Sequence, residues 1–133
     1  MASASRRGDG TADAGGIALP KIVLKVTDQW GDEIVLTEED VARIDAKRGD
    51  TIGRYLAEIR GTLADPDVVY EGRYEDSKVF YGRDRLPDDS RFRGCYVAVI
   101  VRYSTKPASV RTVYFPFNIS GALGRLLFLR RKG

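Results

Sequence analysis

The sequence predicts an α+β fold in which an N-terminal hairpin and two helices pack on a four-stranded antiparallel sheet, with a short C-terminal helix after it. Three patterns predict this order. Apolar residues alternate in two short runs before residue 37, recur at helical spacing up to residue 64, and then return to strand-like runs. Because 43% of the 133 residues are hydrophobic, the chain can form one domain with its own core.

The N-terminal part of the chain divides at residue 18. Residues 1–18 are rich in Ala, Gly, Ser and Asp and hold few large apolar side chains, so we expect them to be disordered. The single domain then spans residues 19–133. A first strand is predicted at residues 22–26, where apolar residues occur at every second position, and a turn at residues 30–32 leads into a second strand at residues 33–36. These two runs predict the hairpin.

Two helices are predicted next. Thr37 is a typical helix N-cap, acidic residues fill the first turn after it, and Asp40 stands at the third helical position. Gly49 ends this helix, and Asp50 or Thr51 caps the second one. The apolar residues of the second helix follow a helical spacing that buries one face: Ile52, Leu56, Ile59 and Leu63.

Strand patterns fill most of the second half of the chain. Four strands in succession favour an antiparallel meander: residues 68–74, 78–83, 96–103 and 109–115. The run Cys95–Val101 is apolar at nearly every position and is expected to be a central strand, whereas Val68–Tyr74 has the pattern of an edge strand. A last short helix is predicted from Asn118 or Ser120, although two glycines are unfavourable within it.

Composition removes several functional classes. The chain has no histidine, which excludes zinc-finger spacing and histidine-dependent triads, and its single cysteine, Cys95, has no partner for a disulfide within the chain. No apolar run approaches the roughly 20 residues of a membrane-spanning helix, so we expect a soluble, cytoplasmic protein without membrane contact. No metal or cofactor is predicted, because turn chemistry explains the acidic residues better than a carboxylate-only magnesium or calcium site: Asp65, Asp67, Asp84, Asp88 and Asp89.

Basic residues gather late in the chain, although the net charge is only +3. Such clustering is typical of a surface that contacts an anionic partner such as RNA, and a solvated charged end is the alternative. The predicted nucleic-acid-binding residues are Arg83, Arg91, Arg93 and Arg111.

The run at residues 109–115 carries the strongest chemical candidates. Strand alternation places Val110, Thr112 and Tyr114 on one face and the residues between them on the other. Thr and Tyr are also good strand formers, so an ordinary structural role is the alternative. The preceding strands bring further cations and a hydroxyl into the same sheet: Lys78, Tyr81, Arg83 and Arg102.

Together these groups have the chemistry that RNA cleavage without a metal ion needs. Cations stabilise the charge that develops on the phosphorane, and hydroxyl groups hold the phosphate. An obvious general base is missing, since unperturbed Lys, Arg and Tyr side chains titrate too high and carboxylates too low. Burial would have to create one by shifting a pKa, for example that of Lys78 or Glu71.

Five short stretches of the chain are similar to a known group of nucleases: Gly31–Ile44, Ile59–Asp67, Val79–Tyr81, Tyr96–Val101 and Val110–Pro116. With them, the chain from about Asp32 to Pro116 resembles the phage-associated members of the barnase/EndoU/colicin/RelE-like nuclease superfamily. The resemblance implies two helices before a four-stranded antiparallel sheet, an RNA-binding cleft on that sheet, and cleavage through a cyclic phosphate without metal.

The resemblance also implies particular residues. Thr112 and Tyr114 match the Thr-x-Tyr-x-Pro strand motif of the superfamily, and Tyr81 matches its aromatic-bearing hairpin strand. Members often carry histidines in the first helix region, and this chain has other residues at or near those positions: Ile44, Lys47 and Arg48. That departure bears on catalysis directly.

The leading hypothesis is a metal-independent, toxin-like ribonuclease domain from a phage or mobile element. Its predicted catalytic residues are Lys78, Tyr81, Arg102, Thr112 and Tyr114, of which Lys78 and Arg102 come from local chemistry and not from the resemblance. The alternative is a non-catalytic relative that binds RNA or a protein. A C-terminal apolar cluster is a candidate surface for an inhibitor or for self-association, or else part of the core: Phe115, Phe117, Leu127, Phe128 and Leu129.

Overall fold

The computed structural model describes residues 21–48, 52–119 and 124–130. The strands are β2 (Ile22–Thr27), β3 (Glu33–Thr37), β4 (Val68–Glu71), β5 (Ser77–Gly82), β6 (Val97–Arg102), β7 (Ala108–Tyr114) and β8 (Leu126–Leu129). The helices are α1 (Glu38–Arg48), the short 3-10 helix η1 (Ile52–Tyr55) and α2 (Leu56–Ala64). The segment predicted to be disordered, residues 1–18, lies outside the described residues, as do Gly49, Asp50 and Thr51.

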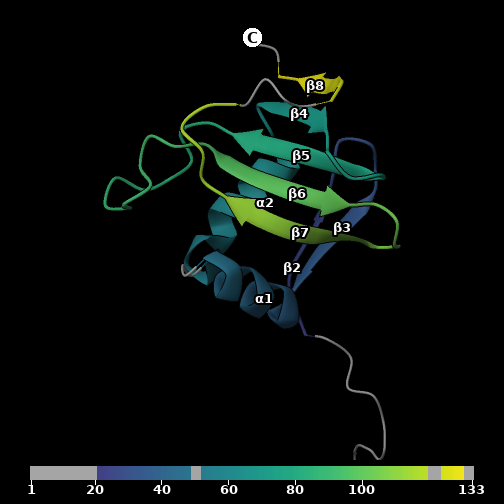
Figure 1. The fold of residues 1–133 in the computed structure, drawn as a ribbon, viewed down its shortest axis with the longest axis horizontal. Helices are drawn as coiled ribbons and strands as arrows, with labels where there is room; N and C mark the ends of the chain where they lie inside the picture. The colour runs from purple at the N-terminus through teal and green to yellow at the C-terminus, as the bar shows by residue number, and fades with distance from the viewer. Residues whose placement is uncertain (1–20, 49–51, 120–123, 131–133) are drawn as a thin grey trace, which may run out of the picture.

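The predicted four-stranded antiparallel sheet is wrong, because the strands form one mixed seven-stranded sheet in the order β2-β3-β7-β6-β5-β4-β8 (Figure 1). Strands β4 to β7 form an antiparallel meander. The β2–β3 hairpin extends this meander, since β3 pairs in parallel with β7 through Ile34 opposite Ala108 and Val35 opposite Ser109. These partners lie more than 70 residues apart, so local patterns do not specify them. The consecutive buried residues Ile34–Leu36 are the one local sign of a strand with a neighbour on each side.

The predicted C-terminal helix is also wrong where the structure describes it. Leu126–Leu129 forms β8, which pairs antiparallel with β4 and places Phe128 opposite Val69. The remaining part of the predicted helix, residues 120–123, lies outside the described residues. The physical reason is tertiary: β4 has backbone groups to satisfy on its outer side, and a four-residue apolar run after Gly124 suits a strand as well as a helix.

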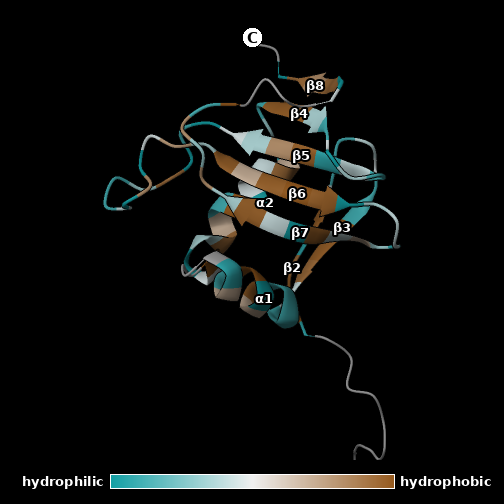
Figure 2. Ribbon diagram, in the orientation of Figure 1, coloured by the Kyte–Doolittle hydropathy of each residue, from teal (hydrophilic) through white to brown (hydrophobic). Residues whose placement is uncertain are grey.

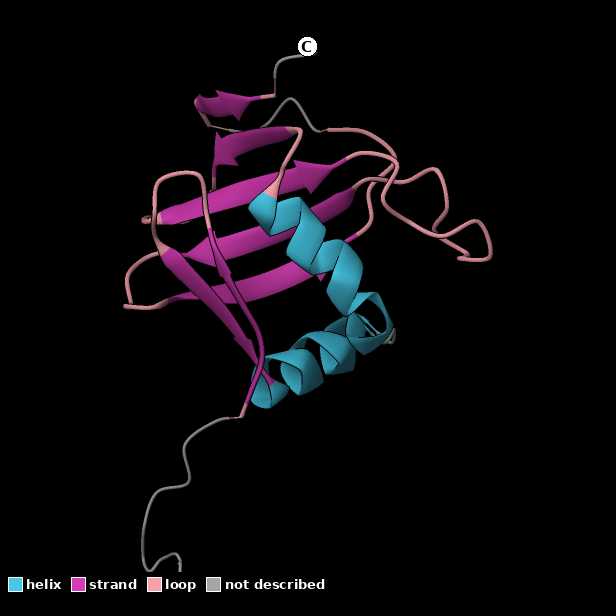
Figure 3. Ribbon diagram, turned by 180° about the vertical axis from the view of Figure 1, so that it is seen from behind, coloured by secondary structure: helices cyan, strands magenta, loops and turns pink. Residues whose placement is uncertain are grey.

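The two helices differ in how they meet the sheet. Helix α2 crosses one face and packs on β2, β5 and β6, whereas α1 lies beside β7 and β3 at the border of that face (Figure 3). The predicted packing of both helices on a four-stranded sheet is corrected accordingly. The core lies between α2 and the apolar central strands, and α1 turns a hydrophilic side outward (Figure 2). No helix in the described part of the chain is long and apolar enough to cross a membrane.

Helix α1 begins with a reciprocal cap. The Asp40 amide donates to the Thr37 hydroxyl at 3.1 Å, and the Thr37 amide and hydroxyl donate to the Asp40 carboxylate at 3.1 and 2.9 Å. The predicted N-cap is therefore confirmed. We expect Thr37→Ala to lower the free energy of unfolding by about 1 kcal/mol, because the first turn loses its side-chain partner. Urea denaturation measures this, and an unchanged midpoint in Thr37→Ala would contradict it; Thr105→Ala, in an exposed loop, is the control.

The C-terminal apolar residues do not form one surface. Phe115 is buried and stacks on Phe92 with ring centres 4.6 Å apart, and Leu127 and Phe128 pack against the core. Phe117 and Leu129, in contrast, are exposed. Self-association through this segment stays a prediction, and Phe117 and Leu129 are the members of the cluster that a partner would reach.

Candidate functional site

One face of the sheet carries no helix in the described residues (Figure 1). On it, tyrosine side chains surround a small buried cluster that includes Tyr81, which is only 1% exposed. The strand register aligns Tyr81 with Ala98 and Ala98 with Tyr114, so the two tyrosines lie two strands apart on this face. Their hydroxyl oxygens are 3.3 Å apart. The sequence-predicted Tyr81 and Tyr114 therefore meet, with Tyr81 beneath the surface.

A bulge in β7 changes the faces predicted for this strand. Ile100 pairs with Thr112 and Val101 with Val110, which leaves Arg111 as the extra residue. Because the bulge interrupts strand alternation, the Val110 side chain joins the core, and Arg111 and Thr112 both line a cavity on the tyrosine side of the sheet. The predicted common face of Val110, Thr112 and Tyr114 is therefore wrong at Val110.

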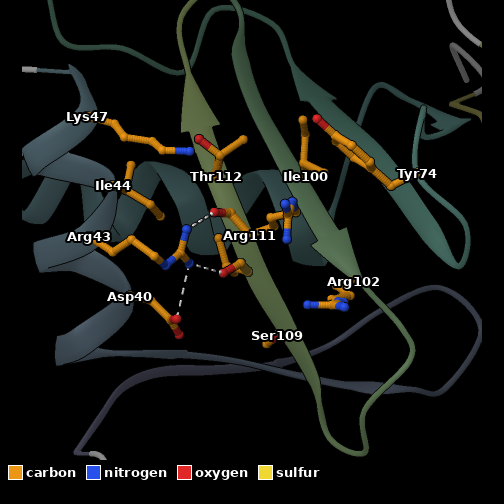
Figure 4. Close-up of a pocket in the computed structure, with 11 residues that line it drawn as sticks. Asp40, Arg43, Ile44, Lys47, Tyr74, Ile100, Arg102, Ser109, Arg111 and Thr112 are labelled. Atoms are coloured by element: carbon orange, nitrogen blue, oxygen red, sulfur yellow. Dashed lines mark hydrogen bonds and ion pairs between the residues drawn. The ribbon is translucent and has the colours of Figure 1, made fainter.

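This cavity of about 520 Å³ lies between α1 and β7 (Figure 4) and is called the α1–β7 pocket below. Four cationic side chains line it: Arg43 and Lys47 from α1, Arg102 from β6, and Arg111 from the β7 bulge. Asp40 is the one carboxylate among the described residues that line it, and these side chains together carry a formal charge of +3. A hollow with this balance attracts an anion.

Arg43 fixes α1 against β7. Its guanidinium donates to the Arg111 carbonyl oxygen at 2.7 Å and to the Val110 carbonyl oxygen at 3.4 Å, and it also bonds Asp40 at 3.2 Å (Figure 4). These carbonyls lie on the stretch of β7 beyond its two pairs with β3. Arg43 thus satisfies an exposed strand edge and holds the cationic side of α1 over the pocket.

The rim of the pocket includes an exposed aromatic ring. Tyr74 is 52% exposed, and the Arg111 guanidinium lies 4.9 Å from its ring centre. The N–H groups of a guanidinium lie in its own plane, so a guanidinium held over an aromatic ring can still donate hydrogen bonds to a further group. Thr112 adds a hydroxyl, and the Lys47 amine points toward it (Figure 4). The pocket therefore combines cations, a hydroxyl group and an exposed aromatic ring.

The structure brings together only part of the predicted catalytic set. Arg102 and Thr112 line the α1–β7 pocket, and Tyr114 lies further along the same face of β7. Lys78 does not join them, because it pairs with Val101 and so occupies the opposite face. Its amine lies 3.6 Å from the Trp30 ring centre and 4.4 Å from that of Tyr103. Desolvation lowers the Lys78 pKa, against the raising effect of nearby carboxylates.

The predicted nucleic-acid-binding arginines are divided in space. Arg111 lines the pocket, whereas Arg83, Arg91 and Arg93 lie on the long connection between β5 and β6. The Arg83 guanidinium lies 5.9 Å from the Tyr96 ring centre and reaches the Tyr96 hydroxyl at 3.4 Å. All three of these arginines are exposed. None of the three lines the α1–β7 pocket.

Three residues of the pocket were not predicted from the sequence: Arg43 and Lys47 of α1, and Tyr74 in the turn after β4. Arg43 and Lys47 are four residues apart, which places two cations on one side of a helix. That spacing was visible in the sequence, but its direction toward β7 was not. Ile44 and Lys47, where the resemblance expects histidine, both line the pocket. Of the two bases considered, Glu71 bonds Arg125 and Lys78 lies on the other face.

Two tyrosines should titrate abnormally. Burial raises the pKa of Tyr81 and of Tyr103 above the ordinary value, and hydrogen bonds with Tyr114 and Asp28 raise them further. The folded protein keeps these protons while the unfolded chain loses them, so their contribution to stability is complete below about pH 10 and falls as the pH rises above it.

In a spectrophotometric alkaline titration, we expect these two of the seven tyrosines to ionise only as the protein unfolds. Tyr103→Phe should reduce the late step by one tyrosine. Reversible ionisation of all seven near pH 10, with the fold intact, would contradict this assignment.

Comparison with known proteins gives no relative: no protein-family model, curated protein or solved structure matches this chain.

Proposed function

We propose that this protein is an RNA-binding module, a non-catalytic relative of the barnase/EndoU/colicin/RelE-like nucleases, whose α1–β7 pocket holds the phosphate backbone of single-stranded RNA. The observation that carries the proposal is the convergence of Arg43, Lys47, Arg102 and Arg111 on one pocket whose described lining holds a single carboxylate. The proposal includes a cytoplasmic location and needs no cofactor.

Single-stranded RNA suits this site better than a small anion or a duplex. Proteins bind single strands by combining a cationic groove for phosphates with aromatic rings on which bases stack. The pocket has both parts, since the exposed Tyr74 lies beside Arg111 at the rim. The bases of a duplex are already stacked on one another, so they are not available to stack on such a ring.

Binding is favoured over cleavage by the nature of the groups around the pocket. Cleavage needs a group that removes a proton from the ribose 2′-hydroxyl near neutral pH. Asp40 is occupied by Thr37 and Arg43, and the α1 positions expected to carry histidine hold Ile44 and Lys47. The described pocket therefore supplies cations and a hydroxyl without a ready base.

The proposal is tested by fluorescence anisotropy with a labelled single-stranded RNA of mixed sequence. We expect saturable binding whose affinity falls with salt, with a log–log slope of about −0.7 for each phosphate neutralised. A duplex RNA of the same length is the competitor and should bind more weakly. Absence of saturable binding at about 50 mM salt would exclude the proposal.

Metal-independent RNA cleavage is the second candidate function. It is favoured by the Lys47 amine that points toward Thr112 at the pocket (Figure 4), since cations and a hydroxyl group held together are the groups that stabilise the charge developing on a phosphorane. Incubation of labelled RNA with the protein in EDTA distinguishes the two. Fragments that disappear in both Lys47→Met and Thr112→Val would support cleavage, whereas bound but intact RNA supports the binding module.

A further inference from the structure

A second hollow lies at the end of the same sheet face. This cavity of about 250 Å³ is formed where the chain leaves β5, enters β6 and leaves β7, and it is called the Phe117 pocket below. Its lining includes Arg83, Asp84, Tyr96, Phe117 and Asn118. None of these residues lines the α1–β7 pocket, so the two hollows are separate.

Phe117 is the most exposed large hydrophobic side chain among the described residues, at 77%. It comes two residues after Phe115, which is 9% exposed and packs with Tyr55 and Phe92. The chain thus buries one phenylalanine and leaves its near neighbour in solvent. Burying a ring of this size stabilises a protein by about 1.5–3 kcal/mol, so an exposed ring beside a hollow indicates a surface that a ligand covers.

The side of the Phe117 pocket opposite the ring is formed by a residue that hydrogen bonds hold in place. Arg83 is held at its backbone, where its amide donates to the Asp67 carboxylate at 2.6 Å, and its guanidinium reaches the Tyr96 hydroxyl. Gly94 has a φ of +84°, and a Cβ at that position would meet no atom within 4 Å, so there is open space beside it. The pocket therefore has an aromatic side, a cationic side and open room beside Gly94.

Polar side chains at the pocket match the edge of a nucleobase. Asn118 offers both a donor and an acceptor through its amide, and Asp84 offers a carboxylate acceptor. A carboxylate accepts a hydrogen bond from an exocyclic amino group, such as N4 of cytosine, and uracil has no such group. These groups favour a base that carries an amino group.

We propose that the Phe117 pocket is a binding site for one unpaired nucleobase with an exocyclic amino group, on the same RNA strand whose phosphates occupy the α1–β7 pocket. This inference rests on the proposed function. The base stacks on Phe117, its edge meets Asn118 and Asp84, and Arg83 lies beside the adjacent phosphate.

The two pockets are close enough for one strand of RNA. Thr112 lines the first and Phe117 the second, and the five residue steps from one to the other span at most about 18 Å of extended chain. Tyr114 lies between them on the same face. A single-stranded site of this length falls at the short end of the roughly 4–16 nucleotides that single-strand-binding folds cover.

Three labelled eight-nucleotide probes test the inference: oligocytidylate, oligouridylate and an abasic ribose-phosphate oligomer. Wild-type protein should bind oligocytidylate most tightly. Phe117→Ala should weaken that binding about tenfold, in line with the loss of one stacked base, and should leave the abasic oligomer unaffected. Phe117→Trp should retain the affinity, and Asp84→Asn should remove the preference for cytosine over uracil. Leu129→Ala, also an exposed apolar residue, is the matched control.

Failure of the inference is distinguishable from failure of the proposed function. If Phe117→Ala binds all three probes like wild type while binding still depends on Arg102, the base site is overturned and the α1–β7 pocket stands. Equal weakening for the abasic oligomer also overturns it. If wild-type protein binds none of the probes, both proposals fail. If wild-type protein self-associates in sedimentation and Phe117→Ala is monomeric, Phe117 belongs to an interface between copies and the base site is overturned.

Discussion

Replacement of Arg102 and Arg111 by alanine together is expected to weaken binding of single-stranded RNA about 100-fold at about 0.1 M salt. Each guanidinium lines the α1–β7 pocket, and under the proposed function each would supply a charged hydrogen bond to phosphate. Such a bond contributes about 1.5 kcal/mol, which is close to a factor of ten in affinity. Titration of a labelled RNA, followed by anisotropy at several salt concentrations, measures the loss of affinity and shows whether it comes from lost phosphate contacts.

The salt dependence separates local contacts from general attraction. Loss of two phosphate contacts should reduce the magnitude of the log–log slope by about 1.4 on a single strand. The matched control is Arg54→Ala with Lys106→Ala, which removes the same charge from two exposed residues outside the pocket. If the control weakens binding as much as the pocket variant, RNA is attracted by net charge and the pocket is not the site.

Local signals predicted the elements better than their partners. The cap formed by Thr37 and Asp40 depends on only four consecutive residues, and the structure confirms it. The pairing of β3 with β7 depends on residues on opposite sides of two helices, and no local pattern encodes it. The strand Leu126–Leu129 was not predicted for the same reason. Its four apolar residues form a strand because they pair with β4, which is distant in sequence.

The site was predictable only where the side chains of a strand point alternately to the two faces of the sheet. Thr112 and Tyr114 share a face as expected, but the bulge at Arg111 moves Val110 into the core and turns Arg111 toward the pocket. A bulge is an extra residue in a pairing, so it is invisible until both strands are known. The cations of α1 were missed for a related reason. A helix face has no direction in sequence, and Arg43 gains its role only from the β7 carbonyls that it contacts.

Lys78 shows how a chemically attractive residue can belong to the architecture. It sits beside a turn organised by Asp28, a carboxylate that is 6% exposed. Asp28 accepts hydrogen bonds from the amides of Trp30 and Asp32 at 2.9 and 2.8 Å and from the Tyr103 hydroxyl at 2.6 Å. The Lys78 amine lies over the rings of Trp30 and Tyr103, so its charge stabilises the same cluster.

Asp28→Ala is therefore expected to destabilise the protein by about 3 kcal/mol, because it leaves two amides and a partly buried hydroxyl without their acceptor and removes a charge that faces Lys78. In thermal unfolding this corresponds to a fall of roughly 10 °C in Tm for a domain of this size. Tyr103→Phe should cost about 1 kcal/mol, and the double variant should lose less than the sum of the two, since the residues share one hydrogen bond. Asp88→Ala, an exposed carboxylate, is the control. Additive losses in the double variant would show that the 2.6 Å contact contributes nothing to stability and that Asp28 acts through the turn alone.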